Sequence, residues 1–324
     1  MNVLSLFDGM SCCHIALDMV GIDVGKYYAA EIDKHAIKVT QANYPDTIQI
    51  GDVTKWRDWD IDWESIDLVT GGFPCQAWSV AGKQLGDKDE RGILFWTMLD
   101  IMQKVLSHNP QAKFLIENVK MKQEFENYIT HHTSQALGKI NKHLINSALV
   151  SAQNRQRFYW TNIDGIKQPH DKGLVLADVI EDDNFNHAVR SHGDYIDKGD
   201  KSMCIDANYH KGADNHGQRS LIQVGSLYEN NGDAGRIYHP SGKGRTLKGD
   251  AGGGGAKMGL IGTSELNYRK LTPLECERLQ TVPENYTLVM ENDKQVVSDT
   301  QRYRMLGNGW TVDVIAHIFS NLEP

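Results

Sequence analysis

The stretch Ile66-Asp67-Leu68-Val69-Thr70-Gly71-Gly72-Phe73-Pro74-Cys75-Gln76 joins a short apolar run to a sharp turn that ends on a cysteine. A short apolar run bounded by turn residues is typical of a buried parallel strand, and the two glycines and the proline end it. In an open α/β sheet, ligands bind in the crevice outside the carboxyl ends of the strands. The stretch therefore predicts an α/β fold with a doubly wound, mostly parallel sheet that holds Cys75 at its ligand-binding edge.

Cys75 has two interpretations when its residue type alone is considered. A thiolate at a strand end is a strong nucleophile if a nearby cation or a helix N-terminus lowers its pKa. A free cysteine is also among the most buried residue types, so a structural thiol after a tight turn is the simpler alternative. The motifs in the rest of the chain decide between the two.

The composition is that of a globular protein, with 324 residues, a hydrophobic fraction of 40% and a charged fraction of 23%. The length favours one large domain with a smaller one beside it. Neither a secretory signal nor an apolar run long enough to span a membrane is present, so no membrane partner is expected. The five cysteines have no zinc-ligand spacing, which predicts no metal site and reduced thiols in a cytoplasmic protein.

Residues 190 to 261 differ in composition from the rest of the chain. They hold ten Lys/Arg and eight Asp/Glu, a local charge of +2, although the whole chain carries −8. They also hold 15 of the 30 glycines, which marks a separate, loop-rich module. Because a local surface rather than the total charge decides phosphate binding, the acidic balance of the chain does not exclude a nucleic-acid partner.

The amino terminus follows the pattern of a nucleoside-binding unit. A strand over residues 3–7 leads through Gly9 into a helix, and a second strand ends on Glu31. In such units the turn lets the backbone approach the ligand, and the carboxylate accepts the ribose hydroxyls. A tight turn beside a solvated glutamate explains the same residues, so both interpretations stay open. The helix is expected to bury Ile15, Met19 and Val20.

Two more strand ends carry polar groups. Asp52 follows a short strand, where it either accepts from an adenine amino group or caps a helix. The triplet Glu117-Asn118-Val119 is expected at the end of strand 114–116, next to the strand that leads to Cys75. Partial burial there would raise the pKa of the glutamate and make it a general acid.

The stretch Ser151 to Trp160 alternates polar and apolar residues and predicts one strand. A period of two puts Gln153, Arg155 and Arg157 on one face of it. They hold a base edge or phosphates, or they are ordinary solvated or ion-paired side chains. Downstream, Thr272-Pro273-Leu274-Glu275 predicts a capped helix and Gly307-Asn308-Gly309 a turn. Helices are also expected over residues 34–43, 93–106, 298–306 and 311–322.

In this order the motifs resemble those of the DNA (cytosine-5) methyltransferases. The resemblance rests on Phe7-Asp8-Gly9, Gly72-Phe73-Pro74-Cys75-Gln76 with Ser79, Glu117-Asn118-Val119, the Gln-x-Arg-x-Arg of Gln153, Arg155 and Arg157, residues 269–280, and Gly307-Asn308. The Phe-Asp-Gly opening is similar to the subgroup that contains the animal de novo enzymes. Ser11 and Cys12 stand where the family usually has further glycines.

The resemblance implies a Rossmann-like, S-adenosylmethionine-dependent methyltransferase fold and a reaction at cytosine C5. Cys75 is implied to add to C6 of a flipped-out base, with Glu117 at N3, Arg157 at O2, and Asn118, Gln153 and Arg155 as further catalytic residues. The activated C5 takes the methyl group, S-adenosylhomocysteine is the product, and no metal takes part. The implied cofactor-binding residues are Phe7, Asp8, Gly9, Ser11, Cys12, Glu31, Ile32, Asp52, Val53, Pro74, Leu94 and Asn308.

The resemblance also implies a target-recognition domain at residues 166–266, inserted into a catalytic domain made of 1–165 and 267–324. Two hairpin-like units are expected in the insert, over 201–222 and 244–261, in a mainly β and loop structure. The implied partner is double-stranded DNA, a cognate restriction endonuclease is a further candidate, and the location is the cytoplasm of a bacterial or phage-infected cell. The expected DNA-binding residues are Ser79, Lys83, Lys211, Arg219, Arg236, Arg245 and Lys248.

Three alternatives stay open at this point. A tRNA-methylating branch of the family carries the same catalytic set, although the large insert favours duplex DNA. A binding protein without catalysis would not need an intact Cys75, Glu117 and Arg157. A nicotinamide dehydrogenase would share the amino-terminal unit but gives no role to Pro74-Cys75.

Overall fold

The computed structural model describes residues 1–74, 92–181, 223–226, 236–238, 240, 260–264 and 267–322, with the backbone alone for the four short strands between 223 and 270. The chain divides into two compact units. Unit 1 comprises residues 1–145, 156–168 and 315–324, and unit 2 comprises residues 146–155 and 169–314. Within the described part of the chain, no helix is long and apolar enough to cross a membrane.

Unit 1 is built on a 7-stranded sheet in the order β3-β2-β1-β4-β5-β7-β6. The register joins β3 to β2, β2 to β1, β1 to β4 and β4 to β5 in parallel, whereas β7 runs antiparallel to β5. The predicted doubly wound, mostly parallel sheet is therefore confirmed. Its strands are β1 (Val3–Leu6), β2 (Tyr27–Ala30), β3 (Ile48–Gln49), β4 (Leu68–Gly71), β5 (Lys113–Val119), β6 (Asn141–Asn146) and β7 (Gln156–Thr161).

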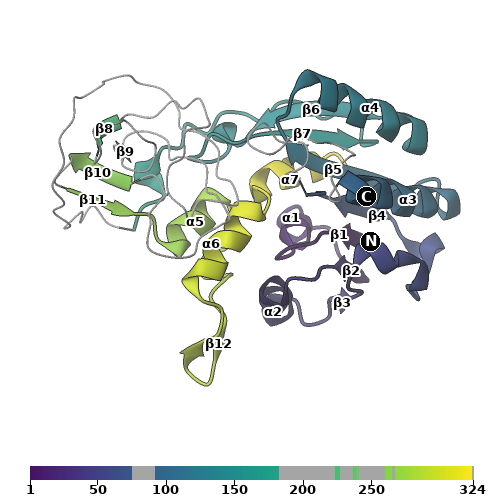
Figure 1. Ribbon diagram of the computed structural model, residues 1–324, viewed down its shortest axis with the longest axis horizontal. Coiled ribbons are helices and arrows are strands. Elements are labelled where there is room, and N and C mark those ends of the chain that lie inside the picture. Colours follow the sequence, from purple (N-terminus) through teal and green to yellow (C-terminus); the bar gives the residue numbers. More distant parts are fainter. Residues whose placement is uncertain are drawn as a thin grey trace. The chain divides into compact units, whose positions relative to one another are not determined.

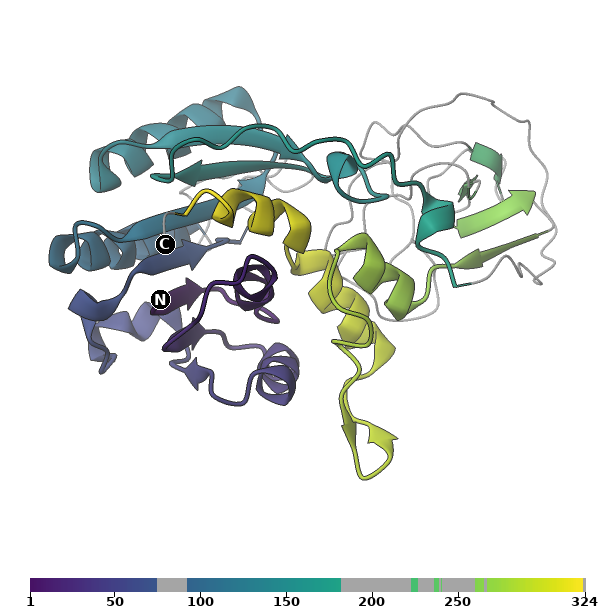
Figure 2. The same ribbon diagram turned by 180° about the vertical axis from the view of Figure 1, so that it is seen from behind.

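The strand order reverses at β1, which lies between β2 and β4. The helices α1 (Cys12–Met19) and α2 (Lys34–Asn43) lie on one side of the sheet, and α3 (Ile93–His108) and α4 (Gln123–Leu137) lie on the other (Figures 1 and 2). A reversal of this kind opens a crevice at the carboxyl ends of the two central strands. Because β4 is one of these two strands and the sequence predicts that it leads to Cys75, the site is expected at this reversal.

The core of unit 1 follows from the period of two along the strands. Leu4, Leu6, Val69, Phe114 and Ile116 alternate along β1, β4 and β5 and pack in one cluster with the buried residues of α3. Each of these five side chains is at most 1% exposed. Gly71 is the last residue of β4. A side chain there would crowd α3, because an added Cβ would lie 2.9 Å from Sδ of Met98.

Most of the expected helices are present, with two corrections. The helix α2 has the predicted bounds, and α3 continues two residues beyond the predicted end. Met19 was expected in the buried face of α1 but is 53% exposed, because the buried stripe follows Cys13, Ala16 and Leu17 at helical spacing. In the other correction, α6 (Asp299–Asn308) continues through Gly307, so Asn308 is its last residue and not part of a turn.

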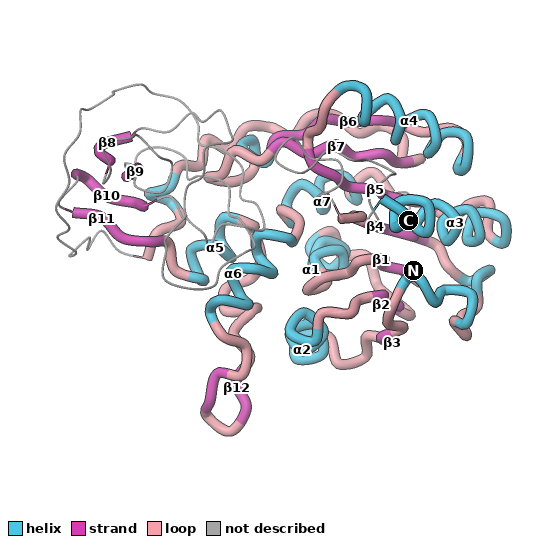
Figure 3. Tube along the Cα trace, in the orientation of Figure 1, coloured by secondary structure: helices cyan, strands magenta, loops and turns pink. Residues whose placement is uncertain are grey.

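The described part of unit 2 contains short strands and helices (Figure 3). Its 4-stranded sheet has the order β11-β10-β9-β8, and of the predicted hairpin units only the arm at Leu260 and Ile261 falls within it. The other arms lie outside the described residues. The strands are β8 (Gln223–Ser226), β9 (Arg236–Tyr238), β10 (Leu260–Ser264) and β11 (Asn267–Lys270).

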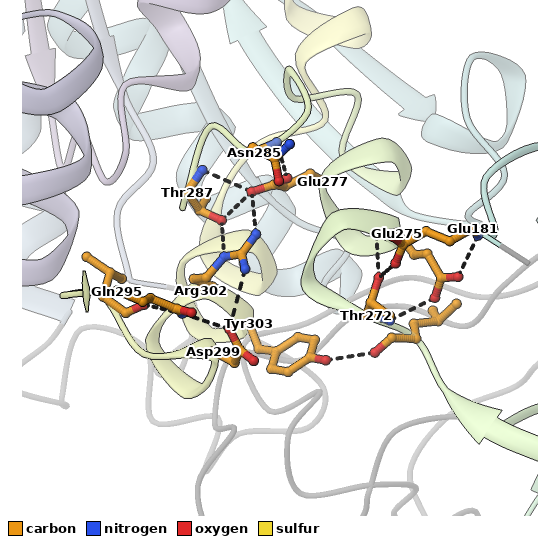
Figure 4. A network of polar contacts seen from close by, with 12 residues as sticks. Glu181, Thr272, Glu275, Glu277, Asn285, Thr287, Gln295, Asp299, Arg302 and Tyr303 are labelled. Carbon is orange, nitrogen blue, oxygen red and sulfur yellow. Dashed lines mark hydrogen bonds and ion pairs between the residues drawn. The ribbon is translucent and has the colours of Figure 1, made fainter. Parts of the chain in front are cut away.

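The helix α5 (Pro273–Leu279) begins as the sequence predicts. Thr272 accepts from the backbone N–H of Glu275, and the Glu275 carboxylate accepts from the N–H of Thr272, with Pro273 in the first turn. The Glu275 carboxylate also accepts from the N–H of Glu181 at 2.8 Å. The Glu275 carboxylate therefore ties the start of α5 to the backbone of Glu181 (Figure 4).

A buried ion pair joins α5 to α6. Nη2 of Arg302 lies 3.2 Å from Oε1 of Glu277, and both side chains are buried. Figure 4 shows the guanidinium between Glu277 and Asp299, and the carboxylate also accepts from the backbone N–H groups of Asn285 and Thr287. Because every charged atom has a partner, the pair is a specific link between the two helices.

A projecting hairpin connects α5 to α6. Its strands are β12 (Met290–Glu291) and β13 (Lys294–Gln295), and all four residues are exposed. The turn residues Asn292 and Asp293 have φ of 49° and 60°. Two successive left-handed residues make the tight turn that matches the twist of a two-stranded ribbon.

Candidate functional site

The turn after β1 is held in an unusual backbone conformation. Phe7, Gly9 and Ser11 have φ of 55°, 63° and 61°. An added Cβ on Gly9 would meet no atom within 4 Å, so the space beside this residue is open. The turn therefore presents backbone to an open side at the carboxyl end of β1, as expected of a nucleoside-binding unit.

Glu31 lies directly after β2 and bonds to this turn. Its Oε2 accepts from the N–H of Gly9 at 2.8 Å, and its Oε1 accepts from the N–H groups of Ile32 and Asp33. The neighbouring Ile32 side chain is 75% exposed. A fixed carboxylate can accept hydroxyl donors, and an exposed apolar side chain beside it can cover the face of a planar ring.

Asp8 points into the protein. Its Oδ1 accepts from the hydroxyl of Tyr27 at 2.7 Å, and its Oδ2 accepts from the hydroxyl of Ser11 at 2.6 Å. Burial raises the pKa of Asp8 to about 6, and the hydroxyl donors oppose this rise. Both carboxylate oxygens are thus used in bonds within unit 1.

The remaining expected cofactor-binding residues have different surroundings. Asp52 caps a short 3-10 helix by accepting from the N–H of Thr54 at 2.9 Å, which is the second of its two predicted interpretations. Cys12 and Val53 are buried, at 3% and 5% exposure. Pro74 and Leu94 are half-buried, and Asn308 ends α6 in unit 2.

Glu117 and Arg157 are brought together by the pairing of β5 with β7. Glu117 lies opposite Tyr159, and Arg157 is two residues away on the same face. Nε of Arg157 lies 2.9 Å from Oε1 of Glu117, and the side chains are 7% and 11% exposed. Glu117-Asn118-Val119 forms the last three residues of β5, whereas the sequence predicts the strand to end before them.

Asn118 links β5 to the turn after β4. Its Nδ2 donates to the carbonyl of Phe73 at 3.0 Å, and its Oδ1 accepts from the N–H of Val119. Both Asn118 and Phe73 are buried. The predicted neighbourhood of these two strands is confirmed by the register of Gly71 with Ile116.

The predicted strand from Ser151 to Trp160 is wrong in its first half. The strand β7 begins at Gln156, so Gln153 and Arg155 do not share its face with Arg157. The reason is that Gln153 and Arg155 find buried partners elsewhere in unit 2. Nε2 of Gln153 donates to Leu279 and Gln280, and the Arg155 guanidinium donates to the carbonyls of Gly307 and Gly309.

Several expected site residues lie outside the described residues. The nucleophile candidate Cys75 is one of them, together with the expected DNA-binding residues Ser79, Lys83, Lys211, Arg219, Arg245 and Lys248. Arg236 begins β9, for which the backbone alone is described. Among the described residues, no group of three His, Cys, Asp or Glu side chains could hold a metal ion.

Two residues of the site escaped the sequence analysis. Tyr27 donates to Asp8, and the hydroxyl of Thr40 on α2 lies 2.9 Å from that of Ser11. Both side chains are buried. A polar side chain in an otherwise apolar position, such as the threonine on the buried face of a helix, was the available signal.

Comparison with known proteins identifies one family over nearly the whole chain. The model of the family "C-5 cytosine-specific DNA methylase" matches residues 1–323. The chain is 28% identical to the Type II methyltransferase M.NlaX of Neisseria lactamica over 99% of this chain and 96% of that protein. It is 31% identical to the Type II methyltransferase M1.ScrFI of Lactococcus lactis subsp. cremoris over 97% of this chain and 76% of that protein.

Solved structures support the fold. The methyltransferase EhMeth of Entamoeba histolytica aligns with a TM-score of 0.65 and 16% identity, over 100% of this chain and 99% of that one. A DNMT2 variant of Spodoptera frugiperda aligns with a TM-score of 0.60 and 20% identity, over 99% and 98% of the two chains. With the family match across nearly its whole length, the chain belongs to the C-5 cytosine-specific DNA methylase family.

Proposed function

We propose that this protein methylates C5 of cytosine in duplex DNA by covalent catalysis, with Cys75 as nucleophile and Glu117 and Arg157 as partners of the base. Membership of the family establishes the coarser statement: the protein is a DNA cytosine methyltransferase, and S-adenosylmethionine is its methyl donor. The proposal concerns which residues act and in what order.

The reaction needs a nucleophile because C5 of cytosine is not reactive enough by itself. Addition of the Cys75 thiolate to C6 makes a new C–S bond and turns the ring into an enamine whose electron pair is available at C5. Transfer of the methyl group to C5, loss of the C5 proton and elimination of the thiolate complete the turnover. The base must leave the helical stack for these steps, since none of its ring faces is accessible within a duplex.

The buried ion pair of Glu117 and Arg157 is the single observation that best supports these roles. Addition at C6 places charge on N3 and O2 of the ring. Glu117 would donate a hydrogen bond or a proton to N3, and Arg157, whose Nε bonds the Glu117 carboxylate and whose Nη1 bonds the carbonyl of Gln156, would assist at O2. Charged donors and acceptors that are fixed before the reaction stabilise such charge most effectively.

Asn118 would position the nucleophile. It holds the carbonyl of Phe73, two residues before Cys75, with a bond of 3.0 Å from a buried amide. This bond fixes the start of the turn that carries the thiol relative to the strand that carries Glu117. We assign Gln153 and Arg155 supporting roles within unit 2, where their bonds lie.

The residues after β1 and β2 fit S-adenosylmethionine, which supplies a methyl group on a sulfonium leaving group. Glu31 offers a carboxylate already oriented by three backbone N–H groups. Ile32 offers an exposed apolar side chain for the adenine, and the open side of Gly9 admits a close backbone contact. No metal is needed in this scheme.

The substrate and the biological setting are also part of the proposal. Residues 166–266 would form the target-recognition domain, and the cations in it would contact the DNA backbone. The names of the relatives suggest a restriction-modification system with a cognate endonuclease, although a 32% identical relative, which this chain matches over 63% of its own length, is an orphan methyltransferase of Bacillus phage rho11s.

The test is transfer of labelled methyl from S-adenosylmethionine to duplex DNA and, separately, to tRNA, with wild type beside Cys75→Ala. Label on C5 of DNA cytosine that disappears in Cys75→Ala supports the proposal. Label on tRNA alone would move the protein to an RNA substrate, and cofactor binding without any transfer would make it a silent member.

A duplex that carries 5-fluorocytosine at the target position tests the covalent step directly. Fluorine replaces the C5 proton and cannot leave as a cation, so the protein should stay bonded to the DNA through Cys75 after methyl transfer. A denaturation-resistant complex with wild type and none with Cys75→Ala is the expected result. Methylation without any such complex on the fluorinated duplex would exclude the nucleophilic role of Cys75.

A further inference from the structure

The turn that follows β1 contains a residue in a conformation that its side chain disfavours. Ser11 has φ of 61° and ψ of 40°, in the left-handed region, immediately before α1. A left-handed conformation is unfavourable for an L-residue with a side chain, whereas glycine adopts it readily. Something in the surroundings must therefore hold Ser11 in place.

The hydroxyl of Ser11 supplies two of the contacts that do so. It donates to Oδ2 of Asp8 at 2.6 Å, and it lies 2.9 Å from the hydroxyl of Thr40. Ser11 and Thr40 are both 0% exposed. Although Ser11 directly precedes α1, its hydroxyl makes no capping hydrogen bond to the first turn of that helix.

Asp8 extends the chain of bonds to β2. Its other oxygen accepts from the hydroxyl of Tyr27, whose side chain is 2% exposed. The N–H of Gly9, between Asp8 and Ser11 in the turn, donates to Glu31. The turn is consequently tied to Tyr27 of β2, to Glu31 directly after β2 and to Thr40 of α2, and the side chains of Ser11, Tyr27 and Thr40 are buried.

We propose that Asp8, Ser11, Tyr27 and Thr40 are positioning residues for the cofactor, which form a side-chain latch that holds the turn of residues 7–11 in its binding conformation. The inference rests on the proposed function, in which this turn and Glu31 bind S-adenosylmethionine. A latch removes the need to order the turn during binding, and such preorganisation is gained as affinity. In this scheme Asp8 and Ser11 act from behind the turn, although the sequence motif counts them among the cofactor-binding residues.

The latch differs from direct contact in what it predicts for Tyr27 and Thr40. If Asp8 and Ser11 acted only by contacting the cofactor directly, the buried hydroxyls of Tyr27 and Thr40 that bond to them would have no role in binding. The latch requires both of them. The decisive variants are therefore Tyr27→Phe and Thr40→Val, which remove one oxygen atom each and keep the shape of the side chain.

The test is calorimetric titration of the full-length protein with S-adenosylhomocysteine, which binds without turnover. Wild type is compared with Tyr27→Phe, Thr40→Val and Thr40→Ser. We expect the first two variants to raise Kd about tenfold, as the loss of a buried hydrogen bond predicts, and Thr40→Ser to restore the wild-type value. In kinetic assays KM for the methyl donor should rise by the same factor, with kcat at saturating donor within twofold of wild type.

Thr133 on α4 offers a matched control. It is 0% exposed, like Thr40, but its hydroxyl has no hydrogen-bond partner within the described structure. Thr133→Val should leave Kd unchanged. Thermal unfolding of every unliganded variant shows whether a change in Kd merely follows a loss of folded protein, and Thr40→Ser keeps the test valid if Thr40→Val is unstable.

The possible outcomes distinguish a failure of the latch from a failure of the proposed function. Wild type that binds S-adenosylhomocysteine and variants that bind equally well would overturn the latch and leave the proposed function intact. Wild type that binds no S-adenosylhomocysteine would overturn the cofactor role of the turn and the latch together. A fall in kcat without a change in KM would also contradict the latch, because it would move the effect from binding to chemistry.

Discussion

The guanidinium of Arg157 lies 2.9 Å from the carboxylate of Glu117, across two antiparallel strands, and both side chains are almost fully buried. Burying two charges has a large desolvation cost, which their attraction and further hydrogen bonds must offset. A buried pair is for this reason weak evidence of stability, and its position in the fold matters more than its existence. Glu117 and Arg157 lie at the carboxyl end of β5, the neighbour of β4 in the sheet.

Glu117→Gln should separate the catalytic from the structural part of this pair. We expect kcat to fall by at least about 100-fold, the lower range of general acid–base effects, and unfolding free energy to fall by about 3–5 kcal/mol because Arg157 loses its partner. Adding Arg157→Met should recover part of the stability in urea unfolding but none of the methyl transfer. Recovery of activity in the double variant would show that the pair serves packing alone.

Asn118→Ala tests whether the amide positions the nucleophile turn. We expect kcat to fall about tenfold or more, while Kd for S-adenosylhomocysteine stays within twofold, because the lost bond is to Phe73 and not to the cofactor turn. Single-turnover methyl transfer and calorimetry are the two measurements. Asn162 is the matched control, since its amide bonds the backbone of Phe114 and Ala112 at the opposite end of β5. Equal losses of kcat in Asn118→Ala and Asn162→Ala would point to general destabilisation.

Asp8 should give the protein a pH-dependent stability of defined sign. Its pKa is raised to about 6, mainly by burial, whereas an unfolded aspartate titrates near 3.8. Between these values the folded protein binds a proton that the unfolded chain does not, so the contribution of Asp8 to stability rises as pH falls from 6 toward 4. The groups that face it are the ionisable Glu31, Tyr27 and Cys13 and the hydroxyls of Ser5 and Ser11.

The measurement for Asp8 is urea unfolding of wild type and Asp8→Asn between pH 7.5 and pH 5. The difference in unfolding free energy should move in favour of wild type as the pH falls, because protonation removes the cost of a buried carboxylate. A pH-independent difference would contradict the raised pKa. Groups that are distant from Asp8 contribute equally in both proteins and cancel in the comparison.

The Glu277–Arg302 pair should dominate the polar contribution to the stability of unit 2. Replacing Glu277 by Gln leaves a buried guanidinium without its charge partner, and we expect a loss of about 3–5 kcal/mol in unfolding free energy. The exposed pair of Lys139 with Asp164, whose side chains are 77% and 70% exposed, is the comparison. Lys139→Gln should cause no measurable change, because water already screens that pair. Similar losses in the two variants would mean that burial does not govern these pairs.

Much of the fold was predictable because local pattern and tertiary structure agree in the sheet. The apolar runs before Asp8 and Gly72 form β1 and β4, and the helix over residues 34–43 has the predicted bounds. Hydrophobic periodicity specifies such elements without knowledge of their neighbours. The capping box at Thr272 was equally readable because its four residues are contiguous.

The incorrect predictions share a physical cause, because contacts between residues far apart in the sequence determine the local structure there. Alternation alone extends the strand of Trp160 back to Ser151, but Gln153 and Arg155 bond to backbone carbonyls more than 100 residues away. The roles of Tyr27 and Thr40 were likewise invisible, since their hydroxyls meet Asp8 and Ser11 only after β2 and α2 have folded against the first turn. Pattern analysis detects period and composition, and these bonds have neither.

The hairpin of β12 and β13 has a practical consequence for watching this protein at work. Its four strand residues are exposed. Its turn residues Asn292 and Asp293 have positive φ and connect strands that are adjacent in the sequence. Exposed loop tips of this kind are the positions where chains best accept inserted sequence. A short tetracysteine tag inserted between Asn292 and Asp293 would therefore allow a fluorescent dye to be attached for single-molecule experiments. Neither terminus would need to be modified.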